Sequence, residues 1–210
     1  MRFADLDCVT VDASGTLVVL DDPVSRLRHG LLEHGIERAP AEIEAAFRAE
    51  IAYYRGRAVE GRDAESVALI RRECCGVFIA ELGLGLDPDA FLPDFIASYR
   101  FRIEEGAAET LRSLQARGLR IAVVSNWDCS LGETLEGLGL SQLVDIAVAS
   151  ALVGSVKPDP EIFRYALAKL SAEPSRSLHV GDEESDRLGA LAAGMHFAPA
   201  PLATAFEGWT

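Results

Sequence analysis

The sequence predicts an α/β protein built on a doubly wound parallel sheet, with a helical segment inserted after the first strand. Residues 6–11 form a short apolar run with β-branched side chains, typical of a strand buried on both faces of a parallel sheet. From Gly106 onward, strand patterns alternate with helix patterns, which indicates a parallel sheet with right-handed crossovers. Between these two parts the apolar residues recur only at helical spacing.

The inserted part is predicted to be entirely helical. Its helices are expected over residues 22–35, 39–54, 64–82 and 88–100, with Gly and Pro in the joints. No strand pattern interrupts them, so the first strand is separated from its own partner elements by this excursion. We therefore expect residues 18–104 to form a helical cap domain over the strand ends of a Rossmann-like core, which comprises residues 1–17 and 105–210.

After the insertion, the core is predicted to alternate regularly between helices and strands. Helices are expected over residues 107–117, 131–138, 160–170 and 186–193, and strands over residues 119–124, 145–149, 177–180 and 196–198. Because sequential strands of such a sheet are parallel, their carboxyl ends meet at one edge, where ligands of open α/β sheets bind.

Composition narrows the possible partners. The 210 residues include 33 acidic and 20 basic side chains, for a net charge of -13, which disfavours nucleic acid and anionic membranes. The same acidic excess suits a bound divalent cation. No apolar run reaches the length of a membrane span, and residues 1–5 lack the apolar region of a signal peptide. We therefore expect no membrane partner, a cytoplasmic location, and a monomer or homodimer.

The cysteines show neither metal-type spacing nor a disulfide framework. They are Cys8, Cys74, Cys75 and Cys129. We interpret all of them as reduced thiols, which agrees with the cytoplasmic location.

Polar residues follow the predicted core strands at the edge where the carboxyl ends meet. They are Asp12, Ser125, Asn126, Lys157, Asp182 and Asp186. Three carboxylates cannot lie together uncompensated, so either a cation binds between them or their pKa values rise. Hard oxygen ligands without His or Cys favour Mg²⁺.

Each of these residues also has a purely structural interpretation. Asp12 suits an Asx-type turn, Ser125 a simple turn, Lys157 a solvated surface, and Asp182 with Asp186 a helix cap. Lysine is rare in this chain, however, since only Lys157 and Lys169 occur, and Lys157 stands in the sequence KPDP.

These residues lie in four motifs, which in chain order are DASGTL at residues 12–17, SN at 125–126, KPDP at 157–160 and GDEESD at 181–186. The four motifs resemble those of the haloacid dehalogenase superfamily of hydrolases, subfamily IA, over essentially the whole chain. The resemblance is closest to the rhythmically-expressed-gene-2-like branch. That branch shares a DAxGTL-type first motif, a following Pro-Val pair at residues 23–24, and the SNxD sequence at residues 125–128.

The resemblance implies Asp12 as the nucleophile that forms an aspartyl intermediate and also binds Mg²⁺. The Ser14 carbonyl and Asp182 would complete the protein ligands, with Asp186 acting directly or through water. Lys157 would balance the charge of Asp12 and a phosphoryl group. The phosphoryl oxygens would be held by Ser125, by the amide of Asn126 and by the amides of Ala13, Ser14, Gly15 and Thr16.

Ser14 departs from the pattern of the family's phosphatases. They carry an aspartate two positions after the nucleophile, which protonates the leaving group and later activates water. A hydroxyl cannot do this near neutral pH, and a missing acid-base group costs ~10² to 10⁴ in rate. Glu183 is a candidate substitute acid, whereas His179, inside an apolar strand, is most simply a core histidine.

The leading hypothesis is a Mg²⁺-dependent phosphatase of a small phosphorylated metabolite. The alternatives are a nearly inactive protein that binds a phosphorylated ligand, and a haloacid dehalogenase, against which Asp182 and Asp186 argue. A phosphonoacetaldehyde hydrolase is set aside because it needs a cap lysine, and residues 18–104 contain none.

Overall fold

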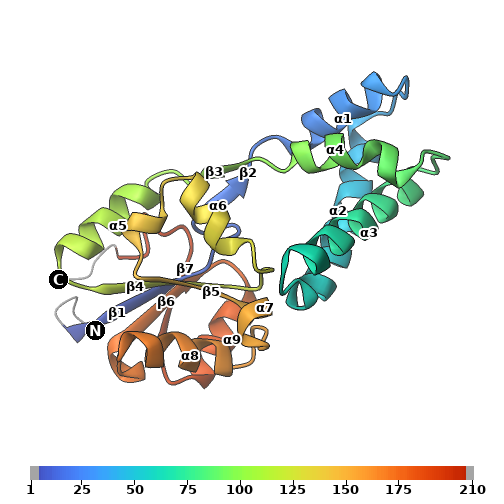
Figure 1. The fold of residues 1–210 in the computed structure, drawn as a ribbon. Helices are drawn as coiled ribbons and strands as arrows, with labels where there is room; N and C mark the ends of the chain where they lie inside the picture. The colour runs from blue at the N-terminus through green and yellow to red at the C-terminus, as the bar shows by residue number, and fades with distance from the viewer. Residues whose placement is uncertain (1–4, 207–210) are drawn as a thin grey trace. The chain divides into compact units, whose positions relative to one another are not determined.

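The computed structural model describes residues 5–206 and contains a five-stranded parallel sheet, which confirms the predicted fold class (Figure 1). The strand order is β5-β4-β1-β6-β7. The strands are β1 (Cys8–Val11), β4 (Arg120–Ser125), β5 (Ile146–Ala149), β6 (Ser177–Gly181) and β7 (His196–Pro199). Val11 lies opposite Val123 of β4 and Val180 of β6, so the carboxyl ends of these three parallel strands lie at the same edge of the sheet.

Helices cover both faces of this sheet. They are α5 (Ala107–Ala116), α6 (Leu131–Gly137), α7 (Ser150–Val153), α8 (Glu161–Leu170) and α9 (Glu184–Ala192), with short 3-10 turns η3 (Ser141–Leu143) and η4 (Pro174–Arg176). Figure 1 shows α5 and α6 on one face and α8 and α9 on the other. Ile162, Phe163 and Leu167 of α8 pack into the buried cluster that includes Val124 of β4, because helical spacing puts them on one side.

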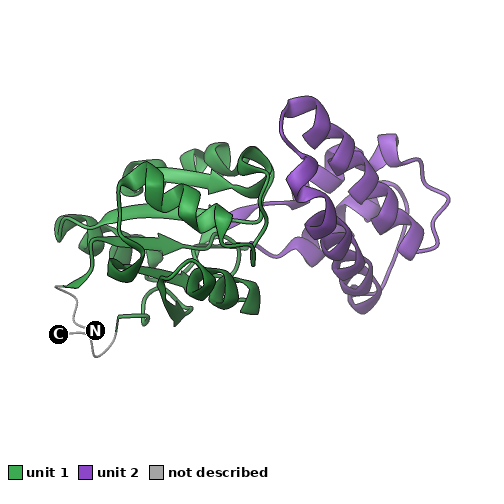
Figure 2. Cartoon of the chain, turned by 90° about the horizontal axis from the view of Figure 1, so that it is seen from below, with its two compact units in different colours: residues 1–19, 102–210 green, residues 20–101 purple. Residues whose placement is uncertain are grey.

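The chain divides into two compact units, coloured separately in Figure 2. The core unit comprises residues 1–19 and 102–210, and the insertion unit comprises residues 20–101. The helices of the insertion unit are α1 (Pro23–Glu33), α2 (Pro40–Arg57), η2 (Ala58–Glu60), α3 (Ala64–Glu81) and α4 (Pro88–Ser98). Three of them begin with proline, whose fixed φ and missing N–H suit the first helical position.

The insertion unit has its own apolar core. Phe78 of α3 stacks on Phe91 of α4 with ring centroids 6.1 Å apart, and Phe95 lies 5.8 Å from Phe78. All three rings are buried. Aromatic pairs in this range add attraction beyond the burial of their area, which explains how a segment of this size packs by itself.

A two-stranded ribbon at the unit boundary was not predicted. It pairs β2 (Val18–Leu20) with β3 (Phe101–Ile103), and backbone bonds from Asp21 to Arg100 and from Glu104 to Leu17 flank it. Strands of three residues are too short to show alternation, and their partners are far apart in sequence. The ribbon flanks the four predicted helices and does not interrupt them, and the two units divide at 19/20 and 101/102.

The remaining differences are local. The short helix α7 was not expected, because four residues carry no helical periodicity. None of the helices in the described part of the chain is both long and apolar enough to cross a membrane. Residues 1–4, on which most of the signal-peptide expectation rests, lie outside the described residues.

Glu50 is a buried carboxyl group in the core of the insertion unit. It lies on α2, is 1% exposed, and accepts a hydrogen bond from the Tyr99 hydroxyl. Burial raises its pKa, although hydrogen bonds from Tyr99 and Cys74 oppose the shift. A raised native pKa means that Glu50 favours the folded state when protonated and that this stability is lost as pH rises through the native pKa.

We predict that Glu50→Gln stabilises the protein at pH 8 by roughly 1 kcal/mol, the usual scale of a single substitution, and much less near pH 4. The measurement is the free energy of unfolding in denaturant at both pH values. Glu44→Gln, at an exposed position of the same helix, is the control and should change little. A Glu50→Gln protein that is less stable at pH 8 than at pH 4, relative to wild type, would contradict this assignment.

Candidate active site

Three carboxylates converge at the carboxyl edge of the sheet, as the sequence predicts. Asp12 follows β1, Asp182 follows β6, and Asp186 lies in the first turn of α9. One ligand oxygen of each lies within 4.8 Å of the others. Asp12 and Asp186 are buried whereas Asp182 is exposed, so the cluster has a buried side and an open side.

Lys157 bridges two of these carboxylates. Its ammonium is buried and donates to Oδ1 of Asp12, to Oδ1 of Asp186 at 2.6 Å and to the Val124 carbonyl at 3.2 Å. An ammonium has three hydrogens, and all three are therefore used. The two carboxylates raise the pKa of Lys157, although burial alone would lower it.

Asp186 is the most heavily engaged of the three acids. Its Oδ1 accepts from Lys157 and from His179 Nε2 at 3.1 Å, and its Oδ2 accepts from the Glu183 amide at 3.0 Å. Burial alone would raise its pKa, but His179 and Lys157 prevail and lower it to about 2. Asp186 is thus a fixed anion, and its free acceptor capacity is small.

The other two carboxylates are held less strongly in the charged state. Burial raises the pKa of Asp12, and the charge of Asp186 adds to this while Lys157 opposes it. Partial burial and the charge of Asp12 raise the pKa of Asp182. Both shifts have burial as their largest cause, and neighbouring negative charge adds to it.

Two glycines permit this crowding. Gly15 has a φ of +85°, and a Cβ there would lie 2.4 Å from Oδ2 of Asp182. A Cβ at Gly181 would lie 2.4 Å from Cγ of Asp186. Any other residue at either position would displace a carboxylate, so the glycines are required by close approach.

The loop after Asp12 presents its polar groups unevenly. Ser14 is exposed, and the Thr16 hydroxyl donates to Oδ1 of Asp182 at 3.3 Å. The Gly15 amide donates to the Val18 carbonyl at 2.9 Å, so this amide is already used inside the loop. Ala13 is buried beneath it.

Asn126 has a role that sequence reasoning missed. Its side chain accepts from the Lys157 amide at 2.8 Å and donates to the Lys157 carbonyl at 3.2 Å. This two-point contact fixes the backbone that carries Lys157. Ser125, the residue before it, is buried at the end of β4 beside Val124. The signal available in the sequence was the amide type itself, which matches a backbone N–H and C=O together.

The donor set fits a divalent cation. Three carboxylates carry a charge of -3 and Lys157 carries +1, which leaves -2 in the cluster. Oxygen ligands in this number are those that Mg²⁺ prefers. The residues present therefore suit the metal that the sequence implies.

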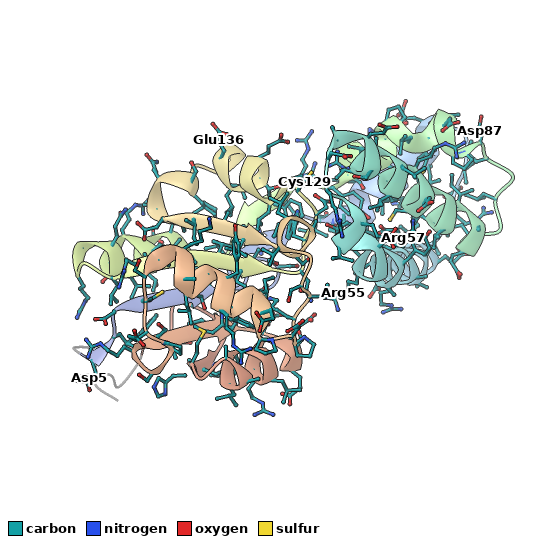
Figure 3. All side chains as sticks on the ribbon, turned by 60° about the horizontal axis from the view of Figure 1, so that its bottom comes forward. Asp5, Arg55, Arg57, Asp87, Cys129 and Glu136 are labelled. Atoms are coloured by element: carbon teal, nitrogen blue, oxygen red, sulfur yellow. The ribbon has the colours of Figure 1, made fainter. Side chains whose placement is uncertain are left out.

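The basic residues at the end of α2 include Arg57, which forms ion pairs inside the insertion unit. Arg55 and Arg57 lie at the C-terminal end of α2 (Figure 3). Arg57 pairs with Glu60 at 3.1 Å and with Glu73 at 3.3 Å. Tyr53 donates to the same Glu73 at 3.0 Å, so this group forms a structural network of the unit.

A family model described as haloacid dehalogenase-like hydrolase matches residues 6–194. The chain belongs to the haloacid dehalogenase-like hydrolases. This confirms the resemblance that the four motifs indicate.

Among curated proteins, the chain is similar to "Haloacid dehalogenase-like hydrolase domain-containing protein 3". It is 44% identical to the mouse protein over 109 residues, 51% of this chain and 43% of that protein. It is 34% identical to the human protein over 196 residues, 83% of this chain and 76% of that protein. The match thus spans less than half of the mouse relative.

Two further likenesses bear on the reaction. The chain is 32% identical to the pyrophosphatase PpaX of Halalkalibacterium halodurans over 140 residues, 60% of this chain and 63% of that protein. The structure of an L-2-haloacid dehalogenase from Xanthobacter autotrophicus matches with a TM-score of 0.70 and 26% identity, covering 93% of this chain and 77% of that one. This fold is compatible with both chemistries, so the residues of the site have to distinguish them.

We predict that Gly15→Ala weakens Mg²⁺ binding by displacing Asp182. Gly118→Ala is the matched control, because Gly118 has a φ of +79° but no atom within 4 Å of an added Cβ. Both variants should lose about 1–2 kcal/mol of stability through left-handed strain. Only Gly15→Ala should lose the rise in melting temperature that Mg²⁺ gives. Equal Mg²⁺ responses in the two variants would show that Asp182 does not depend on Gly15.

Proposed function

We propose that this chain is a Mg²⁺-dependent phosphatase of a small phosphorylated metabolite and acts through an aspartyl phosphate at Asp12. The observation that carries the proposal is the buried Lys157 ammonium between Asp12 and Asp186, with Asp182 completing an acidic cluster. Phosphoryl transfer depends mainly on positioning and charge neutralisation, which this arrangement supplies. The likeness to a pyrophosphatase supports the same chemistry.

In the first step, Asp12 attacks the phosphorus of the substrate. A bond from its carboxylate oxygen to phosphorus forms, and the bond from phosphorus to the leaving-group oxygen breaks. Lys157 donates to Oδ1 of Asp12, so we assign the attack to Oδ2. Ser125, together with the Asn126, Ala13, Ser14 and Thr16 amides, holds the phosphoryl oxygens.

In the second step, water attacks the phosphorus of the aspartyl phosphate. The bond between phosphorus and the Asp12 oxygen breaks, a proton of the water passes to solvent, and inorganic phosphate leaves with the Asp12 carboxylate restored. Asp12, Asp182 and the Ser14 carbonyl would hold Mg²⁺, which would neutralise the phosphoryl charge. Asp186 already accepts three hydrogen bonds, so it would act on the metal through water.

Residues 18–104 are proposed to act as a cap that selects the substrate, in a cytoplasmic protein that is a monomer or homodimer. The acidic charge disfavours nucleic acid and membranes as partners. A nearly inactive protein that binds a phosphorylated ligand is the second candidate, because of Ser14. A dehalogenase is the third, because of the structural likeness, but it would have no use for a cluster of net charge -2.

We predict that Asp12→Asn abolishes phosphatase activity without unfolding the protein, because it removes the attacking charge but little volume. EDTA should also stop hydrolysis, and added Mg²⁺ should restore it. The control is Asp159→Asn, which changes an exposed carboxyl group in the Lys157 loop that caps the Glu161 amide. Full activity in EDTA, with chloride released from 2-chloropropionate, would overturn the proposal in favour of a dehalogenase.

Ser14 sets the expected substrate preference. Because no carboxyl group stands there to protonate a leaving group, aryl and acyl phosphates should be cleaved far better than alkyl phosphates. We predict that Ser14→Asp raises kcat/KM for an alkyl phosphate by ~10-fold or more, the lower part of the range for a placed acid-base group. Equal wild-type rates on aryl and alkyl phosphates, with no gain in the variant, would mean that another group such as Glu183 carries the proton.

A further inference from the structure

His179 is a buried polar side chain that the proposed reaction does not use. It lies in β6, is 0% exposed, and sits edge-on against Phe163 with ring centroids 4.8 Å apart. Its Nδ1 lies 2.8 Å from the Thr10 hydroxyl, and its Nε2 lies 3.1 Å from Oδ1 of Asp186. Both ring nitrogens therefore have a partner, one on β1 and one on α9.

The chemistry of these partners decides which nitrogen carries the proton. Asp186 is a charged carboxylate and only accepts, so Nε2 must carry a hydrogen. The Thr10 hydroxyl can donate or accept, and it holds the Nδ1 side of the ring at 2.8 Å. The ring is thus held at both nitrogens, with its Nε2–H directed at Asp186.

We propose that His179 is a positioning residue, which Thr10 holds in place so that its Nε2–H fixes Asp186 and thereby holds Lys157 against Asp12. Oδ1 of Asp186 accepts from His179 and Lys157 together. If His179 is lost, Asp186 can rotate about its side-chain bonds, and Lys157 loses a fixed partner. Supporting groups of this kind typically affect activity or affinity by about 10- to 100-fold.

A mere core histidine would be replaceable by an apolar residue of similar size with no effect on Lys157. The two interpretations therefore differ in what happens to Lys157, and this can be measured without substrate.

The chain offers an unusually clean probe, because Lys157 and Lys169 are its only lysines. Lys157 is buried and Lys169 is exposed, so the second serves as an internal standard. The experiment labels the folded protein with an amine-reactive acetylating reagent and measures the Lys157 to Lys169 labelling ratio by mass spectrometry. We expect His179→Leu to raise this ratio about tenfold or more, and His179→Gln, which keeps an N–H donor, to stay close to wild type.

A second pair of variants covers the case in which His179→Leu does not fold. Thr10→Val keeps the shape and removes the hydroxyl, whereas Thr10→Ser keeps the hydroxyl. We expect the labelling ratio to rise in Thr10→Val and not in Thr10→Ser. His196→Gln, which changes a partly buried histidine on β7, should leave both the ratio and the activity unchanged. If His179→Leu and Thr10→Val, or whichever of the two folds, label with the wild-type ratio, the proposal is overturned.

Two further readouts complete the test. In ¹⁵N-histidine NMR at about neutral pH, Nε2 of His179 should carry a proton; an unprotonated Nε2 overturns the assignment. The kinetic consequence rests on the proposed function: kcat should fall about 10- to 100-fold in His179→Leu with little change in KM. If labelling changes as expected but no variant or wild type hydrolyses phosphate esters, the positioning role stands and the proposed function fails.

Discussion

The site depends on the burial of one ammonium group between two carboxylates. Removing Lys157, Asp12 and Asp186 from water is costly, and the mutual attraction of the charges offsets that cost only when geometry and hydrogen bonding are nearly complete. Here the third hydrogen of Lys157 reaches the Val124 carbonyl, and Asn126 fixes the Lys157 backbone. This is possible because β1, β4 and β6 are parallel neighbours. Their carboxyl ends bring residues far apart in sequence to the same edge of the sheet.

The residues around Lys157 and its two carboxylates form a buried side and an open side of the site. Thr10, His179 and Asp186 form a hydrogen-bonded line inside the core, whereas Asp182 and Ser14 face outward. A rigid interior with an acidic, exposed rim suits a cation and a phosphoryl group that must enter and leave. Preorganised charges of this kind act without having to reorganise when the reaction occurs.

The insertion unit differs from the core unit in how its interior is packed and how its buried carboxyl group is satisfied. Its core is aromatic and contains a buried Glu50 that is satisfied by neutral donors rather than by a cation. Arg57, at the end of α2, pairs with Glu60 and Glu73 of the same unit. The unit thus has an apolar core of its own, between β2 and β3.

The sequence by itself determined the fold class, the family and the residues at the strand ends, because strand and helix periodicities and four spaced motifs are local properties. It did not reveal the β2–β3 ribbon, since each strand has only three residues and pairs with a distant one. Tertiary structure alone decided that Asn126 clamps the Lys157 backbone and that His179 contacts Asp186. These contacts join residues on separate elements. Which of many polar side chains meet in the interior depends on the register of β1, β4 and β6, which no single segment encodes.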